Sequence, residues 1–184
     1  MQMNTVNLNP MKPKWPLMVN LALFQAGWFA CLLLPLVYAL LVAVVILLIH
    51  FAMLVPRMDW RSEAVLLMKA VAVGAVLEVA YLLFGILVKV EGGILPPLWL
   101  LIIWVLFATT FRHGLFWLRD RRLMSALFAA LAAPGSYFGG ATLNESMDLG
   151  EPIIISLLVV AVSWAIVFPL LMAMVEPLKS EPVR

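Results

Sequence analysis

The feature that most constrains this chain is a series of long apolar runs of the kind that cross lipid bilayers. Five such runs fill the sequence, and the first, Leu17 to Val55, has the length of two membrane passes. A transmembrane helix needs about 20 apolar residues to cross a hydrocarbon layer of about 30 Å. Of the 184 residues, 65% are hydrophobic and 12% are charged, and the mean hydropathy is +1.09. These values exclude a soluble globular domain and indicate an integral membrane protein.

We predict an all-α bundle of six transmembrane helices, which forms a single domain over residues 1–184. Pro35 divides the first run into two helices, because proline lacks a backbone donor and disfavours helix in the residue before it. Pro134 and Gly135 interrupt the fifth span and make it short. The predicted spans cover residues 17–34, 36–55, 64–88, 96–118, 123–139 and 152–175, with short cytoplasmic tails at 1–11 and 177–184.

Basic residues predict how this bundle is oriented. Lys and Arg collect in cytoplasmic loops. With both termini in the cytoplasm (N-in/C-in), eleven of the twelve basic residues lie at the inner surface, and Lys89 is the exception. The outer loop before the sixth span carries Glu145, Asp148 and Glu151 and no basic residue. We therefore predict a multi-pass membrane protein whose two termini lie in the cytoplasm. The net charge of +2 follows from the inner loops, and nucleic acid is not an expected partner.

Glu78 is the clearest ionisable residue inside a predicted span. A charged group at the centre of a membrane helix costs about 2.5–3.5 kcal/mol on insertion scales, so its presence needs a reason. Gly74, Glu78, Tyr81 and Gly85 follow helical spacing and share one face. Small residues beside a carboxylate predict a face that packs against protein rather than lipid. Two interpretations stay open: a carboxylate that carries a proton or contacts a substrate, or a hydrogen-bonded tether between helices.

A second polar group is predicted near the inner boundary of the membrane. Thr109, Arg112 and His113 are spaced to project to one side of the fourth helix. Arg112 can extend to phosphate headgroups, hold an anionic headgroup or pair with an acid. His113 can act in acid–base chemistry or be structural. His50 falls at nearly the same depth, so the two histidines could ligate a b-type haem, but two histidines alone do not justify assigning a cofactor or a metal ion.

Standard catalytic motifs are missing from the sequence. It contains no HExxH, paired CxxC, Walker loop, GxSxG or GxGxxG, so the usual metalloprotease, redox, nucleotide and serine-hydrolase sites lack their starting residues. The single cysteine, Cys31, excludes an internal disulfide.

Three segments of the chain resemble one protein family. They are Asn20–Phe29, the stretch from Pro97–Leu100 through Phe107–Thr110 to His113, and Pro134–Tyr137. These segments are similar to a domain-of-unknown-function family of small multi-span bacterial inner-membrane proteins, and the resemblance covers nearly the whole chain. It implies a stand-alone membrane protein, and it transfers no activity, cofactor or catalytic residue.

These observations lead us to expect a membrane component without a standard catalytic motif of its own, in an accessory, envelope-adaptation or partner-binding role. The alternative is a lipid- or isoprenoid-modifying membrane enzyme, with a cytoplasm-facing pocket around His50, Glu78, Arg112 and His113. A small transporter that acts as an oligomer comes third. The expected partners are membrane lipid and either another membrane protein or a second copy of this chain.

Overall fold

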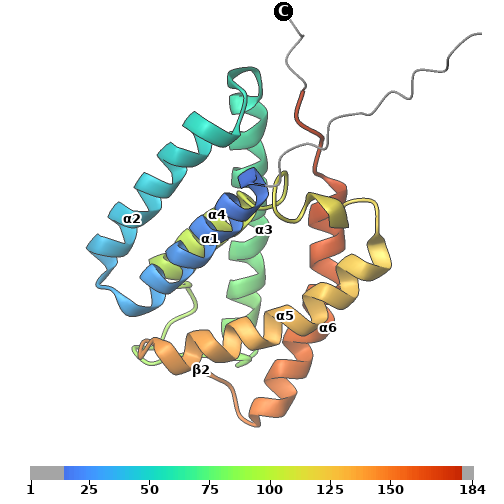
Figure 1. Ribbon diagram of the computed structural model, residues 1–184. Coiled ribbons are helices and arrows are strands. Elements are labelled where there is room, and N and C mark those ends of the chain that lie inside the picture. Colours follow the sequence, from blue (N-terminus) through green and yellow to red (C-terminus); the bar gives the residue numbers. More distant parts are fainter. Residues whose placement is uncertain (1–14, 180–184) are drawn as a thin grey trace, which may run out of the picture.

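The computed structural model describes residues 15–179, and the regular secondary structure of this part of the chain is helical apart from one short pair of strands. The predicted N-terminal tail and residues 180–184 of the C-terminal tail lie outside the described residues. Six α-helices follow one another along the chain (Figure 1). They are α1 (Trp15–Leu33), α2 (Leu36–Ile49), α3 (Trp60–Leu83), α4 (Leu98–Ala108), α5 (Arg122–Leu143) and α6 (Ile153–Ala173).

Most of these helices have the length and composition of membrane spans. Five helical segments in the described range are long and apolar enough to cross a membrane. They are Trp15–Leu33, Leu36–Leu54, Arg57–Leu83, Arg122–Leu143 and Ile153–Ala173. The remaining helix, α4, has only 11 residues. The predicted all-helical fold with several helices able to cross a membrane is thus confirmed, and the number of crossings depends on α4.

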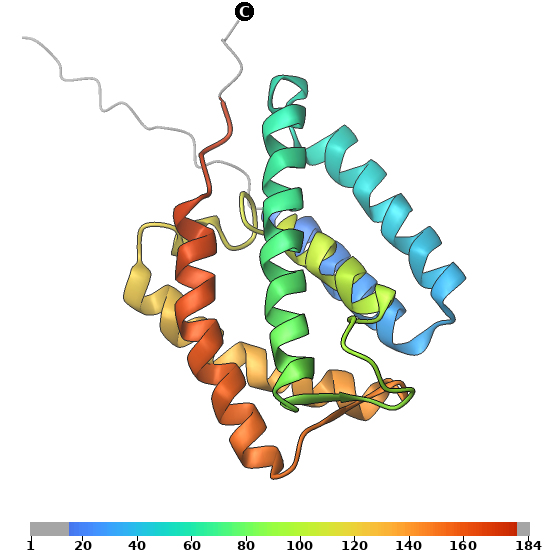
Figure 2. The ribbon, with the colours of Figure 1, turned by 180° about the vertical axis from the view of Figure 1, so that it is seen from behind.

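The short helix α4 lies at the centre of the molecule, between α1 and α3 in both views (Figures 1 and 2). It contributes side chains to two apolar cores. Trp104 belongs to the larger core, which it shares with residues of α3, α5 and α6. Ile102 and Leu106 belong to the smaller core, which they share with residues of α1 and α2. Because α4 is enclosed by other helices, its own length does not have to match the thickness of a membrane.

The fourth predicted helix is wrong in its second half, which is not α-helical as predicted. α4 ends at Ala108, and hydrogen-bonded turns over residues 109–115, the turn segment, lead to the 3-10 helix η3 (Phe116–Leu118). Arg112 and His113 therefore lie on turns, and their predicted helical spacing does not apply.

Two threonines explain this early end of α4. The hydroxyl groups of Thr109 and Thr110 donate to the carbonyls of Leu106 and Phe107, at 2.6 Å in each case. The backbone N–H of Thr110 bonds three residues back, to the carbonyl of Phe107 at 2.9 Å. Side-chain bonds to the preceding turn compete with the α-helical pattern, and bonds to the third residue back tighten the chain into 3-10 turns.

The third helix is displaced along the sequence relative to the prediction. α3 begins at Trp60, four residues early, and ends at Leu83, five residues early. Its first turn contains Glu63, and a carboxylate is favoured there because the helix dipole is positive at the N-terminus. Gly85 follows with a φ of 67°, a left-handed conformation that glycine adopts readily. Gly85 therefore lies beyond the helix rather than on the face of Glu78.

The predicted interruption of the fifth helix is also wrong. α5 runs through Pro134 to Leu143, four residues past its predicted end. A proline removes one backbone donor, and membrane helices tolerate it where neighbouring helices and local adjustments support the backbone. Here α5 crosses α6 and packs against it, so a neighbouring helix of this kind is present (Figure 1).

A short antiparallel pair of strands joins two loops that the sequence analysis places outside the membrane. β1 (Leu87–Lys89) follows α3, and β2 (Met147–Leu149) follows α5. Val88 pairs with Asp148 at the centre of the pair. The strands hold the ends of α3 and α5 together at one end of the molecule (Figure 2).

Candidate functional site

Four polar residues from three segments meet at one end of the molecule. We call His50, Glu63, Arg112 and His113 the inner polar cluster. His50 is the first residue of the π-helix η1 (His50–Leu54), which continues α2, and Glu63 lies in the first turn of α3. Arg112 and His113 come from the turn segment after α4. Single π turns are rare in proteins, and those that occur are often found at functional sites. The π-helix η1 therefore supports a functional site at this end of the molecule.

Glu63 is the centre of the inner polar cluster. Its Oε1 lies 2.8 Å from Nε2 of His50. Its Oε2 lies 3.3 Å from Nη1 of Arg112, close enough for charge attraction but outside hydrogen-bond geometry. Arg112 Nη1 also donates to the hydroxyl of Ser62, at 2.9 Å. Glu63 thus carries one bond to a histidine and one ion pair, and it joins three segments of the chain.

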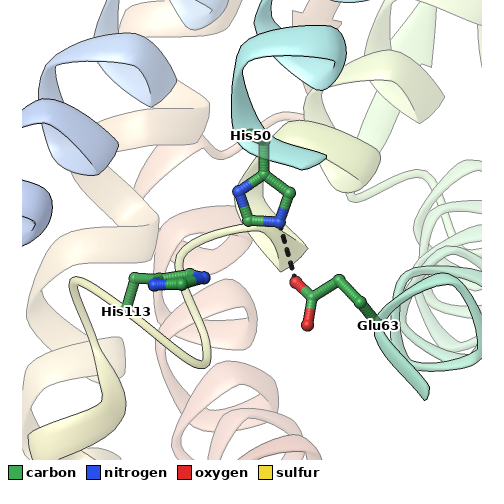
Figure 3. A group of neighbouring side chains, drawn as sticks. All are labelled: His50, Glu63 and His113. Atoms are coloured by element: carbon green, nitrogen blue, oxygen red, sulfur yellow. Dashed lines mark hydrogen bonds and ion pairs between the residues drawn. The ribbon is translucent and has the colours of Figure 1, made fainter. Parts of the chain in front are cut away.

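His113 completes the group from the opposite side (Figure 3). Its ring centroid lies 5.2 Å from that of His50, with the two rings at 87°. The ligand atoms that His50, Glu63 and His113 offer lie within 4.8 Å of one another. The two histidines, for which the sequence predicts a similar depth, are therefore in contact. A haem ligated by both does not fit, because no porphyrin plane can enter between rings in edge-to-face contact.

Three residues of the inner polar cluster are buried, and the cluster is only partly satisfied. His50 and Glu63 are 1% and 0% exposed, Arg112 is also buried, and His113 is half-buried. Several of its atoms have no hydrogen-bond partner among the described residues: His50 Nδ1, Glu63 Oε2, Arg112 Nε and His113 Nε2. Buried polar atoms in folded proteins nearly always have a partner, so such a concentration needs a functional or structural explanation.

Glu63 is the residue of this cluster that the sequence analysis missed. The predicted third span starts one residue after it and leaves Glu63 in a loop. A signal for an earlier start exists, because Asp59 stands immediately before the helix and Glu63 lies in its first turn. Starting the helix at Trp60 places Glu63 near the end of α2 and hence near His50.

A second candidate site is a cavity between α1, α3, α4, α5 and α6, which we call the membrane cavity. Its volume is about 400 Å³, and its lining is mostly apolar and aromatic. Leu21 and Trp28 line it from α1, Tyr137 from α5 and Phe168 from α6. Glu78 is the one carboxyl group among the described residues that line this cavity.

The carboxyl group of Glu78 is bonded on one side only. Its Oε1 accepts from the indole Nε1 of Trp104 at 2.9 Å and from the hydroxyl of Tyr137. Its Oε2 has no hydrogen-bond partner among the described residues, and the side chain is 0% exposed. The two bonds agree with a tether between α3, α4 and α5, and the unpaired oxygen agrees with contact to a ligand. Both interpretations of Glu78 therefore remain open.

The four residues that the sequence analysis groups in one pocket belong to two places. His50, Arg112 and His113 lie together, but Glu78 follows Glu63 by fifteen residues on α3, which is about 22 Å along the helix. The membrane cavity nevertheless extends toward the inner polar cluster, because Thr110 and Leu115 of the turn segment line it. A long molecule could therefore reach from one place to the other.

The fold and these two sites define an all-helical protein in which several helices are long and apolar enough to cross a membrane and polar groups are buried among them. The chain belongs to the family described as "Protein of unknown function (DUF2878)", whose model matches residues 17–170. This confirms the resemblance found in the sequence. No match was found among curated proteins or among solved structures.

Proposed function

We propose that this protein is a lipid-binding accessory component of a bacterial inner membrane, which holds one amphiphilic lipid molecule in the membrane cavity. The observation that carries the proposal is the half-bonded carboxyl group of Glu78 in an otherwise apolar cavity of about 400 Å³. Ligand pockets typically have volumes of about 300–1,000 Å³ and combine apolar walls with a few polar groups. The membrane cavity matches that description.

The chemistry of Glu78 indicates what kind of molecule would bind. A buried polar atom without a partner costs free energy, and a ligand that supplies a hydrogen-bond donor removes that cost. The apolar walls favour an acyl or isoprenoid chain over a polar solute. The proposed ligand is therefore an amphiphile whose apolar chain carries a hydroxyl, amine or amide donor.

Tryptophan fluorescence offers a direct test of this proposal. Four of the seven tryptophans, Trp28, Trp99, Trp104 and Trp164, line the membrane cavity. In nanodiscs, dibromooctadecanol should quench their emission saturably. It should bind with higher affinity than dibromooctadecane, which lacks the hydroxyl. Glu78→Leu should weaken binding of the alcohol about tenfold, since leaving the buried hydroxyl of the ligand without its partner costs about 1–3 kcal/mol.

The matched control is Glu145→Gln, which changes an exposed carboxylate outside the cavity and should leave quenching unchanged. Equal quenching by the alcohol and the alkane in wild type, or unchanged quenching in Glu78→Leu, would contradict the proposed ligand class.

A lipid-modifying enzyme is the second candidate function, and the inner polar cluster favours it. His50, Glu63 and His113 supply acid–base groups beside the cationic Arg112, which can hold an anionic headgroup. The membrane cavity would hold the chain of a lipid whose headgroup reaches the cluster. Lipid analysis of a deletion strain separates the two candidate functions. Unchanged acyl and headgroup composition would contradict the lipid-modifying activity and would leave lipid binding as the function.

A further inference from the structure

We propose that His50, Glu63 and His113 form a binding site for a divalent transition-metal ion, with zinc as the ion that their donor set fits best. Two imidazoles and one carboxylate are ligands that zinc takes in catalytic sites, where water or substrate occupies the fourth position. The same set also binds iron(II) in one class of oxygenases. This proposal does not depend on lipid binding in the membrane cavity.

The positions of the three donors support a shared ion. They come from η1, α3 and the turn segment, and the fold brings their ligand atoms within 4.8 Å of one another. Zinc binds such donors at 2.0–2.2 Å, which requires donor separations of about 3.3 Å in a tetrahedral site. His113 would have to move inward by at most about 1.5 Å, and the 2.8 Å contact between His50 and Glu63 would open slightly.

Unpaired atoms at the cluster are the second line of support. Nε2 of His113 and Oε2 of Glu63 are buried and have no hydrogen-bond partner among the described residues. A metal ion at the centre of the group would bind a lone pair from each of the three side chains. It would therefore relieve the cost of leaving such atoms unpaired in a buried place.

Charge at the site indicates the nature of the fourth ligand. Two neutral imidazoles, one carboxylate and a divalent ion leave a net positive charge, and Arg112 adds another at 3.3 Å from Glu63. A second pocket of about 380 Å³ adjoins Arg112 and Ser62. It is also lined by three basic residues, Arg61, Lys69 and Lys179, and by one carboxylate, Glu176, so positive charge is in excess. An anion, such as a phosphate group or hydroxide, is thus the fourth ligand that this environment favours.

The test is metal binding by the full chain, purified in detergent through a tag that contains no histidine. After chelation, wild type should bind one zinc ion per chain, counted by elemental analysis, and cobalt(II) should give the visible absorption of a tetrahedral site. His113→Ala should weaken zinc binding at least about 100-fold, since even loss of residues that only orient ligands costs 10–100-fold. Glu145→Gln, which changes an exposed carboxylate outside the cluster and outside the membrane cavity, should bind zinc like wild type.

Replacement of His113 by another zinc ligand distinguishes ligation from a structural role. His113→Cys should restore zinc binding and add a thiolate-to-cobalt charge-transfer band, which repacking alone could not produce. Circular dichroism and size-exclusion chromatography of each variant control for folding. Substoichiometric zinc in wild type, or wild-type affinity in a folded His113→Ala variant, would overturn the proposal.

Discussion

At Gly74, the backbone of α3 lies directly against the indole ring of Trp104. A Cβ atom at this position would lie 2.2 Å from Cδ2 of Trp104, so Gly74→Ala forces the ring to move. That ring also donates a hydrogen bond to Glu78 and stacks on Trp164, with the two ring centroids 5.1 Å apart. We expect Gly74→Ala to lower the free energy of unfolding by about 1–3 kcal/mol, the usual cost of overpacking.

Unfolding in a titration with SDS, followed by tryptophan fluorescence, measures this loss. Gly135→Ala is the control, because a Cβ atom there meets no atom within 4 Å and alanine favours helix. Equal stability of Gly74→Ala and wild type would show that α3 and α4 are further apart than described.

Residues on one helix could be assigned from the sequence, but their partners on other helices could not. Helical spacing placed Gly74, Glu78 and Tyr81 on one buried face, and the structure confirms this. Spacing is a local property, whereas the bonds from Trp104 and Tyr137 to Glu78 depend on how distant segments pack. For this reason Glu78 could be recognised as a buried acid, but its aromatic partners and the membrane cavity were not predicted.

At the level of elements, the apolar runs predicted the helices, and Pro35 predicted the break between α1 and α2. The ends of α3, α4 and α5 and the two strands were not predicted. A run of apolar residues sets where a helix can form. Competing hydrogen bonds, such as those of Thr109 and Thr110, decide where it stops. The pairing of β1 with β2 involves three residues on each side, too few to produce an alternating pattern in the sequence.

The register of β1 and β2 can be tested with a disulfide. Val88 and Asp148 are directly opposite each other in the strand pair, so their Cα atoms are about 4.5–5.5 Å apart, within the range that a disulfide spans. Both residues are exposed and therefore accessible to an oxidant. In a Cys31→Ala background, Val88→Cys with Asp148→Cys should form an intramolecular disulfide under mild oxidation. Intact mass after alkylation counts the remaining thiols.

Val88→Cys with Glu145→Cys is the matched control, because three residues of displacement separate these thiols by about 10 Å along the strands. Efficient crosslinking of this control pair, or free thiols in the Val88 and Asp148 pair, would contradict the register.

At the level of the whole molecule, hydrogen bonds define two opposite ends. At one end, Asn20 of α1 accepts from the N–H of Gly114, and Asp59 accepts from the N–H of Lys179. At the other end, Asn144 donates to the carbonyl of Leu32. Among the described residues, the first end carries most of the basic residues: Arg57, Arg61, Arg112, Arg119, Arg121, Arg122 and Lys179. The positive-inside rule then predicts that this end faces the cytoplasm.

The segment from α4 to η3 decides whether the number of crossings is even. With 11 residues α4 rises only about 16 Å, roughly half of the hydrocarbon layer. The turn segment would complete the crossing, and all of its residues except His113 are buried. Irregular backbone is tolerated at membrane depth where protein encloses it. We therefore expect this segment to cross the membrane although α4 alone cannot.

Cysteine labelling on both sides of that segment tests the crossing and the orientation together. Glu91 and Asp120 flank the segment and are exposed, and the side chain of Asp120 is 78% exposed. In a Cys31→Ala background, an impermeant maleimide should label Glu91→Cys in intact spheroplasts, but Asp120→Cys only after permeabilisation. Labelling of both from outside would mean that the α4 segment does not cross. Labelling of Asp120→Cys alone would mean that the basic end, and the inner polar cluster with it, faces away from the cytoplasm.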